Sequence, residues 1–465
     1  MATIAHVVVL MLENRSFDSM LGRLYAAGPG FDGLSGNEFN EWNGKRYQVW
    51  TSPNVTPDVL TIPTPGPNED FLEMTEQIFG VGAAPGAPAN MGGFVANYMK
   101  RPGRDPRTVM HGFTPDQLPV LSTLARSFGV SDRWHASAPN KTWPNRFFAH
   151  TGTGGGYVNN ASKHAPFKMT TIFNRLMKKQ RSWRIYFHDT AHAMLLSKIW
   201  SEVPDHIYDF HDQFLNDARD GTLPNYSFIE PRYFTLPLSK LPNDQHPSHD
   251  VSLGERLISR CYDALRQGKN WERTLFIITY DEHGGMYDHV PPPPAVSPDS
   301  FRPDGFAFDR YGVRVPAVIV SPWIPPGSVI RPLGSAHPFD HTSILSTLRK
   351  LFSLGDPLTA RDAVAPDLLP ALSLPAPTNT GPQSLAMPSA SASQAELLAA
   401  VQGPPNEMQR SLAQAAQKLP AGAASIPDHV RRLSRAKPIA PPAPATAEEA
   451  RELALTGVRR FIGGI

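Results

Sequence analysis

Short apolar runs that alternate with stretches of helical pattern constrain the fold of this chain most strongly. The runs are rich in β-branched and aliphatic residues and occupy residues 6–12, 183–187, 226–230, 274–280 and 315–321. Near-continuous apolar runs of this length are typical of strands that are covered on both faces. Helical patterns lie between them, at residues 114–128, 171–180, 251–268 and 340–352. This alternation predicts an α/β fold with a mainly parallel central sheet flanked by helices.

The composition changes after Leu374. The last part of the chain is rich in Pro and Ala and contains short Ala/Leu/Gln-rich stretches of helical pattern. We therefore predict a main domain at residues 1–374 and a Pro/Ala-rich C-terminal extension with short helices at residues 375–465. A proline-rich extension is poor material for a catalytic core, so we expect it to be dispensable for chemistry. Within the main domain, residues 29–110 are rich in Pro, Gly and Asn, which predicts long surface excursions.

Charge and cysteine content exclude two classes of protein. The chain of 465 residues carries 44 Lys and Arg against 42 Asp and Glu, a formal net charge of +2. Such a balance provides no long-range field for a nucleic acid or another polyanion, so nucleic acid is not an expected partner. The single cysteine, Cys261, excludes an intramolecular disulfide framework, and its neighbours show no metal-ligand spacing. We expect Cys261 to be a small buried hydrophobe.

The N-terminal sequence lacks the features of a secretory signal. It has no basic segment followed by a long apolar one, and the apolar run at residues 7–12 is too short to cross a bilayer. We expect a soluble protein without a transmembrane segment, either cytoplasmic or exported without a recognisable signal peptide. Transient contact with a membrane surface stays open.

Metal-binding and proton-transfer side chains follow three of the apolar runs. These clusters are Glu13–Asn14, His188–Asp189 and Asp281–His283, the last of which precedes two glycines. Ligands of an open parallel sheet bind at the carboxyl ends of its strands. A single acidic residue there is usually a solvated cap. Two acidic strand ends with an adjacent Asn instead favour a hard divalent cation, because close carboxylates repel one another unless a cation compensates them.

Two loops add histidines near the strand ends. His246 and His249 lie in the sequence NDQHPSHD, and His337 and His341 lie in SAHPFDHTS. An isolated loop histidine is more often structural than catalytic. Four histidines beside strand ends indicate a site more strongly than any one of them does.

Four ordered motifs carry a family resemblance. They are VVVLMLENRSFDSMLG, APNKTWPNRFFAHTGT, ITYDEHGGMYDHV and DHTSILSTL, and together they span roughly residues 4–352. They resemble the successive motifs of the bacterial phosphoesterase family that contains non-haemolytic phospholipases C and AcpA-type acid phosphatases. That family is a branch of the alkaline phosphatase superfamily, so the resemblance implies an alkaline-phosphatase-like fold and a phosphoesterase catalytic domain.

The resemblance also implies a metal site. In this sequence Glu13, Asn14, Asp281 and Glu282 would bind one divalent metal ion, and Thr142 would be both a metal ligand and the nucleophile. Carboxylate and amide oxygens are hard donors, which suits Mg²⁺, Mn²⁺ or Ca²⁺, and Zn²⁺ also tolerates carboxylates. Proximity to a cation would stabilise the alkoxide form of the Thr142 hydroxyl, which is otherwise a weak nucleophile.

Two histidines complete the implied catalytic set. The stiff KTWPNR frame would hold Thr142 in line with phosphorus, and attack would produce a phosphothreonine that water then hydrolyses. The family pattern makes His246 the candidate general acid for the leaving group. It makes His188 a donor to a non-bridging phosphate oxygen.

Three functions compete at this point. The first is a phospholipase C that acts on phospholipid phosphodiesters, the second an acid phosphatase that acts on small phosphomonoesters. The third is a toxin-like or scaffold protein that acts through its C-terminal extension. Thr at position 142 favours the phospholipases, whereas the lack of the β-rich C-terminal domains of long phospholipases favours the phosphatases. A sulfatase is disfavoured because the sequence around Cys261 lacks the C/S-x-P-x-R motif.

Overall fold

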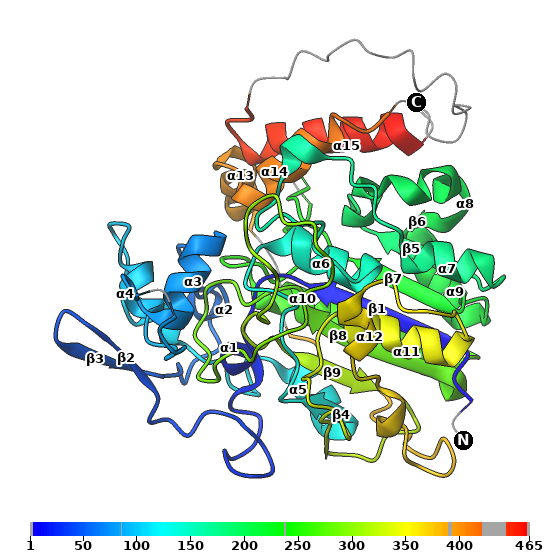
Figure 1. Cartoon of the computed structure of the whole chain (residues 1–465), viewed down its shortest axis with the longest axis horizontal. Helices are drawn as coiled ribbons and strands as arrows, with labels where there is room; N and C mark the ends of the chain where they lie inside the picture. The colour runs from blue at the N-terminus through cyan, green and yellow to red at the C-terminus, as the bar shows by residue number, and fades with distance from the viewer. Residues whose placement is uncertain (1–2, 85, 237–238, 389–392, 421–442, 463–465) are drawn as a thin grey trace.

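An eight-stranded sheet forms the centre of the computed structural model, which describes residues 3–84, 86–236, 239–388, 393–420 and 443–462 (Figure 1). The strand order across the sheet is β10-β4-β9-β8-β1-β7-β5-β6. The strands are β1 (His6–Leu12), β4 (Gly129–Ser131), β5 (Trp183–Phe187), β6 (Ile207–Asp209), β7 (Tyr226–Glu230), β8 (Thr274–Tyr280), β9 (Ala317–Val320) and β10 (Ser328–Val329).

The pairing of the strands is mainly parallel, as predicted. β1 lies between β7 and β8 and runs parallel to both, with Val7 opposite Tyr226 on one side and Leu275 on the other. β9 runs antiparallel to β8 and β4. All five predicted apolar runs form strands of this sheet. The parallel strands β1, β7 and β8 therefore end at one edge, where the sequence places its acidic clusters.

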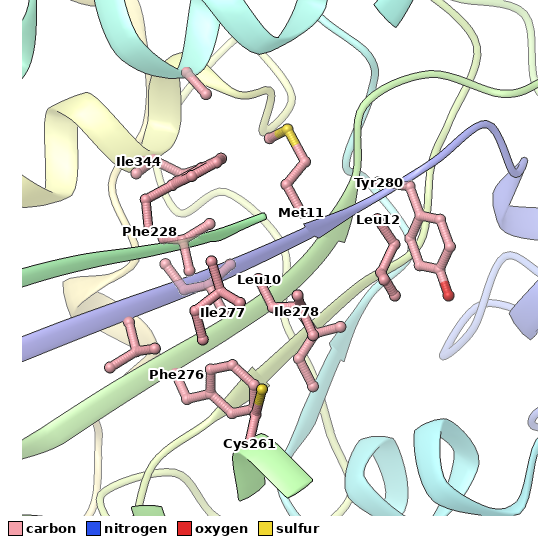
Figure 2. Close-up of a cluster of buried hydrophobic side chains, with 14 of the residues drawn as sticks. Leu10, Met11, Leu12, Phe228, Cys261, Phe276, Ile277, Ile278, Tyr280 and Ile344 are labelled. Carbon is pink, nitrogen blue, oxygen red and sulfur yellow. The ribbon is translucent and has the colours of Figure 1, made fainter. Parts of the chain in front are cut away.

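Helices cover both faces of the sheet. Figure 2 shows Cys261 of α10 (Val251–Gln267) on one side of the strands and Ile344 of α11 (Thr342–Phe352) on the other. Cys261 is fully buried, as predicted. The remaining helices of the main domain are α1 (Phe17–Leu21), α2 (Pro57–Leu60), α3 (Phe71–Phe79), α4 (Phe94–Tyr98), α5 (Pro119–Ser127), α6 (Thr142–Thr151), α7 (Ile172–Lys178), α8 (Val203–His206), α9 (Leu215–Asp220) and α12 (Ala360–Val364).

The segment at residues 29–110 is more ordered than its composition predicts. The hairpin of β2 (Phe39–Trp42) and β3 (Lys45–Gln48) projects from the body (Figure 1), and α2, α3 and α4 follow it. Ile78 and Phe94 belong to a small hydrophobic cluster of their own. Most apolar residues of this segment are dispersed among Pro and Gly, and outside α3 no local period shows that tertiary contacts bring them together.

The C-terminal extension contains three described helices, in agreement with the predicted short helices. They are α13 (Gln394–Gln402), α14 (Glu407–Ala416) and α15 (Ala447–Ile462), and they group at one side of the molecule (Figure 1). Leu412 and Phe461 join the main hydrophobic core, and the Phe461 ring lies 5.4 Å from that of Trp200. The boundary at residue 374 stays a prediction. No described helix has the combination of length and apolarity that a membrane span requires.

Candidate functional site

Thr142 is the first residue of α6, and side-chain hydrogen bonds hold its turn rigidly. The amide of Asn145 accepts from the Ala138 N–H at 3.1 Å and donates to the Asn140 carbonyl at 2.6 Å. Pro144 lies in the first helical turn, where a missing N–H costs no helical hydrogen bond. The helix ends at Gly152 in the left-handed conformation. The KTWPNR segment therefore fixes where the Thr142 hydroxyl lies.

The Thr142 hydroxyl points to the end of β1. Its Oγ1 donates to Glu13 Oε2 at 3.4 Å, and both residues are buried. Asn14 follows in a left-handed backbone conformation, with φ of +53°, which non-glycine residues adopt rarely and often at functional sites. The Asn14 N–H donates to Asp281 Oδ1 at 2.9 Å, which joins the ends of β1 and β8.

A buried arginine organises the acidic cluster. Arg146, one turn after Thr142 on α6, donates through Nε and Nη2 to Glu13 Oε1 at 3.0 and 2.6 Å. Its Nη1 donates to Glu230 Oε2 at 2.9 Å, and its Nε lies 3.7 Å from Asp281 Oδ2. A planar guanidinium can hold several carboxylates in fixed directions. Arg146 thus positions the carboxylates but carries only one of the positive charges that they call for.

Three ligand oxygens of the predicted metal set are buried and unpaired. Asn14 Oδ1, Asp281 Oδ2 and Glu282 Oε1 have no hydrogen-bond partner within the described part of the chain. Buried polar atoms are normally satisfied, so an unpaired set that converges from two strand ends needs a partner. A hard cation fits this set, because all three atoms are oxygens.

The electrostatics of the cluster also favour a cation. Burial raises the pKa of Glu13 and of Glu282 well above the usual range, and the charge of Asp281 raises both further. Burial raises the pKa of Asp281 too, although Arg146 opposes the shift. Each ionised carboxylate therefore makes the next one harder to ionise, and a bound divalent ion would reverse that penalty.

His246 pairs with an acid that the sequence analysis did not single out. Its Nε2 lies 3.6 Å from Glu69 Oε2, and its backbone N–H donates to Asp244 Oδ1 at 3.1 Å. Burial alone would lower the pKa of His246, but the charge of Glu69 outweighs it and raises the pKa to about 10. Burial would raise the pKa of Glu69, and the charge of His246 lowers it instead. His246 is therefore a protonated donor beside the carboxylate cluster.

His188 has a different set of neighbours. It follows β5, its Nδ1 donates to the Glu230 carbonyl at 2.9 Å, and its ring stacks on Phe210. Within the described residues no hydrogen bond or ion pair joins His188 to Thr142 or Glu13. The structure thus brings Thr142, His246 and the four predicted carboxylate and amide ligands together and leaves His188 outside that cluster.

A second acidic cluster lies behind the same turns. Asp18, Asp288 and His289 each offer a ligand atom, and these atoms lie within 4.8 Å of one another. Arg314 donates to Asp18 Oδ1 at 2.9 Å and to Asp288 Oδ1 at 3.0 Å. Because a guanidinium already compensates these carboxylates, the cluster is better suited to hold the turns together than to bind an ion.

An apolar cavity opens beside the His246 loop. It has a volume of about 800 Å³ and lies between the loop, α2 and the C-terminal extension. Pro247 and His249 line it on the loop side, and Leu60, Met387 and Ala400 line it elsewhere. An elongated apolar group could therefore lie against Pro247 and His249 of the loop that also carries His246.

Comparison with known proteins decides the family. A profile of the Phosphoesterase family matches residues 4–355, which include every residue of the carboxylate cluster. The chain belongs to this family. It is a phosphoric ester hydrolase. The relatives of this phosphoesterase include "Non-specific phospholipase C1" of Arabidopsis thaliana, 40% identical over 381 residues that cover 77% of this chain and 69% of that protein. "Phospholipase C A" of Mycobacterium tuberculosis is 29% identical over 430 residues, which cover 83% of this chain and 80% of that protein.

Solved structures resemble the phosphoesterase more distantly. A protein of the alkaline phosphatase superfamily from Vibrio parahaemolyticus aligns with a TM-score of 0.34 and 14% identity over 54% of this chain and 63% of that one. The lipoteichoic acid synthase LtaP of Listeria monocytogenes aligns with a TM-score of 0.33 and 11% identity over 82% of this chain and 76% of that one.

Sequence reasoning missed two residues of the cluster for different reasons. Glu69 lies in the Pro/Gly-rich segment at residues 29–110, far from any strand end, and no local signal marks it. Arg146 stands in the quoted KTWPNR motif, four residues after Thr142. Helical spacing would have placed Arg146 on the same face as Thr142.

Proposed function

We propose that this phosphoesterase is a metal-dependent phospholipase C that hydrolyses phospholipid phosphodiesters through a phosphothreonine. The observation that carries the proposal is the contact of the rigidly held Thr142 hydroxyl with Glu13, beside unpaired buried oxygens of Asn14, Asp281 and Glu282. The names of the plant and mycobacterial relatives support the choice of phospholipids. The apolar cavity beside the His246 loop supports it independently, because a phosphomonoester of a small alcohol has no use for such a volume.

The residues present suit one divalent ion. Glu13, Asn14, Thr142, Asp281 and Glu282 would hold it, and the bound ion would supply positive charge that favours ionised oxygens at the site. Arg146 keeps Glu13 and Asp281 in place from behind. Hydrogen bonds between the ends of β1 and β8 and helix α6 hold the ligand side chains in place.

Thr142 would attack phosphorus in the first displacement. Its proton can pass to Glu13, because the Thr142 hydroxyl donates a hydrogen bond to that carboxylate. The new bond joins Thr142 Oγ1 to phosphorus, and the bond from phosphorus to the diacylglycerol oxygen breaks. The rigid start of α6 reduces the entropy lost in reaching the geometry of attack.

His246 would protonate the leaving oxygen. The pKa of about 10 keeps the imidazolium charged at neutral pH, and Glu69 orients its Nε2. After the diacylglycerol leaves, the neutral imidazole can accept a proton from water, which attacks the phosphothreonine in the second displacement. The bond from phosphorus to Thr142 Oγ1 then breaks, Glu13 returns the proton to that oxygen, and the phosphorylated head group is released.

The test is substitution of Thr142. Thr142→Ala should abolish turnover of p-nitrophenylphosphorylcholine and of lipid vesicles, because both need the same nucleophile, and Thr142→Ser should keep part of the activity. Loss of a nucleophile removes several orders of magnitude in rate, whereas loss of an orienting contact costs roughly tenfold to a thousandfold. Thr151→Ala, on the same helix and equally buried, is the matched control.

Acid quench during turnover should trap labelled phosphate on the peptide that contains Thr142. A label on a histidine would reassign the nucleophile. Preference for p-nitrophenylphosphate over the diester and the vesicles would instead indicate an acid phosphatase, and inactivity on all three substrates would contradict phosphoester hydrolysis at this site.

A further inference from the structure

A basic pocket lies at the carboxyl end of β5, outside the Thr142 cluster. Its volume is about 360 Å³. Four permanently or usually charged residues and two histidines contribute to its wall. These residues are His188, His211, Arg232, Lys240, Arg256 and Arg260.

Two potential hydrogen-bond donors of this pocket lack partners. Arg232 is only 6% exposed, yet its Nε has no hydrogen-bond partner among the described residues, and its Nη1 reaches only the Leu241 carbonyl, at 3.2 Å. Nε2 of His211 is also buried and unpaired there, whereas Nε2 of His188, whose proton lies on Nδ1, is an acceptor. A buried guanidinium nitrogen without an acceptor is costly, so Arg232 Nε favours the binding of an acceptor group in the pocket.

The positive charge of the pocket is poorly compensated. No acidic residue lines it, and within the described chain no ion pair includes Arg232, Lys240, Arg256 or Arg260. Arg256 and Arg260 stand one turn apart on α10, a spacing at which like charges repel.

The charges of Asp189, Asp244 and Asp209 act on Arg232, but each of these acids has its hydrogen bonds elsewhere. Asp244 accepts from His249 Nδ1 at 2.6 Å. Asp189 accepts the backbone N–H groups of Tyr233 and Phe234, both at 2.9 Å. Asp209 accepts the N–H of His211 at 2.7 Å and so caps the helical turn that follows β6. The pocket therefore presents donors and positive charge to whatever enters it.

We propose that this pocket binds a phosphate group, at a site separate from the Thr142 centre. Guanidinium forks match the tetrahedral oxygens of phosphate in geometry and charge. Arg232 would supply the fixed, buried contact, and Arg256 and Arg260 would close on the anion from α10. The inference does not rest on the proposed phospholipase activity, since none of these three arginines contacts the carboxylate cluster.

The phosphate can come from two sources. Leu241 and Leu253 line both this pocket and the apolar cavity of about 800 Å³. A phospholipid could therefore place its head-group phosphate among the arginines and an acyl chain in the cavity. Free inorganic phosphate offers the same oxygens without the chain.

The experiment titrates the full-length protein with inorganic phosphate by calorimetry. An Asp281→Asn background weakens phosphate binding at the Thr142 centre, so the second site dominates the signal. Arg256→Gln/Arg260→Gln in that background should weaken phosphate binding by at least about tenfold, because two charge-assisted contacts are lost. Lys269→Gln, an exposed lysine just beyond α10, is the matched control and should bind as the background does.

Two results would overturn the proposal: no phosphate binding in the Asp281→Asn background, or equal affinity in the background and the double variant. The double variant on the wild-type sequence should keep its turnover of p-nitrophenylphosphorylcholine, and a loss would place the arginines in the catalytic centre. Co-sedimentation with phosphatidylcholine vesicles, with and without phosphatidate, identifies the source. Phosphatidate-dependent binding that the double variant loses indicates a lipid head group, and unchanged vesicle binding with weakened phosphate binding indicates the free ion.

Discussion

At the scale of single residues, two turns hold the candidate site in unusual backbone conformations. Asn14 after β1 has φ of +53°, and Gly284 after β8 has φ of +63°. A Cβ atom at Gly284 would lie 1.9 Å from the Asn14 carbonyl oxygen. No side chain fits in that space, so the turn that carries Asp281 and Glu282 can approach Asn14 only if residue 284 is glycine.

Substitution of Gly284 should therefore damage the site and the fold together. In Gly284→Ala the left-handed backbone conformation is strained, and the added methyl group must push the two turns apart. The overpacking alone should lower the free energy of unfolding by about 1–3 kcal/mol. Gly334→Ala is the matched control, since Gly334 has φ of +66° and open space around its Cβ position. Urea unfolding should show a larger loss for Gly284→Ala, and metal titration should show weaker binding. Equal losses in the two variants would contradict the close approach.

The carboxylates of the cluster should bind metal and support activity together. Asp281→Asn removes one negative charge from the carboxylates that would hold the metal ion. Bound metal and turnover should therefore both fall steeply while the fold persists. Elemental analysis and activity after chelation, with rescue by Mg²⁺, Mn²⁺, Ca²⁺ or Zn²⁺, measure this. Asp299→Asn, at an exposed loop position, should change neither. Full activity in metal-free Asp281→Asn protein would contradict a metal-dependent site.

The predictability of the site differs from residue to residue. Glu13 and Asp281 could be predicted because a strand end is a local feature and parallel strands bring their ends together. Glu69 could not, because its position beside His246 depends on how a Pro/Gly-rich segment folds over the sheet edge. His188 also follows a strand, but β7 lies between its strand and β1, so the same rule places it in a neighbouring pocket.

At the scale of elements, local periodicity identified the sheet and the long helices. The run at 274–280 coincides with β8, and the pattern at 251–268 coincides with α10 to within one residue. The antiparallel direction of β9 was not predictable, because an apolar run reads the same in either direction. Helices α2 and α4 were missed because each is too short for a period to emerge. Helix α3 has nine residues with Phe71, Met74 and Ile78 at helical spacing, so its pattern could have been recognised within the Pro/Gly-rich segment.

Helix α14 attaches the C-terminal extension to the main domain close to Thr142. Glu407 at its start pairs with Lys141, and Gln409 donates to the Tyr233 carbonyl at 2.8 Å. Lys141 also pairs with Asp70 at 2.9 Å. It stays a prediction that the C-terminal extension is dispensable for chemistry. Truncation would remove a helix, α14, that contacts the main domain beside Thr142.

Docking of α14 should depend on Leu412, which is buried in the main core. Truncation of a buried leucine leaves a cavity, so Leu412→Ala should lower the free energy of unfolding by about 2–5 kcal/mol. If detachment of α14 costs less than this, the helix should detach from the main domain instead. Hydrogen exchange should then accelerate in residues 407–416. Leu398→Ala on α13, where the side chain is 46% exposed, is the control. Identical exchange in both variants would show that α14 does not dock through Leu412.

At the scale of the whole molecule, one charge network joins segments that are distant in the sequence. Arg314 before β9 donates to Asp18 after β1 and to Asp288 after β8. His289 donates to Asp18 Oδ2 at 2.7 Å through Nδ1 and to Asp32 Oδ1 at 3.1 Å through Nε2. Both ring nitrogens therefore face carboxylates, which requires the charged imidazolium. The network holds the turns that carry the candidate site against the first loop of the segment at residues 29–110.

The stability of this network should depend on pH in a predictable direction. Burial would lower the pKa of His289, but Asp18 and Asp32 outweigh it and raise the pKa to about 10, above the unfolded value of 6.5. The contribution of the protonated His289 to the free energy of unfolding is thus complete below about pH 6.5 and is lost as the pH rises through 10. The hydrogen bond from His289 lowers the pKa of Asp32 from 3.8 to about 2. The stabilisation from the ionised Asp32 is therefore lost only as the pH falls below 3.8 towards 2. His289→Asn should lower the free energy of unfolding by about 1–2 kcal/mol between roughly pH 4 and 6.5, the usual range for a hydrogen-bonded ion pair that water partly reaches. Urea unfolding of the wild type and the variant should show this difference shrinking towards pH 10, whereas His337→Asn, at a half-buried loop histidine, should show no such trend. A difference that stays constant from about pH 5 to 10 would mean that His289 acts through its shape and not through its charge.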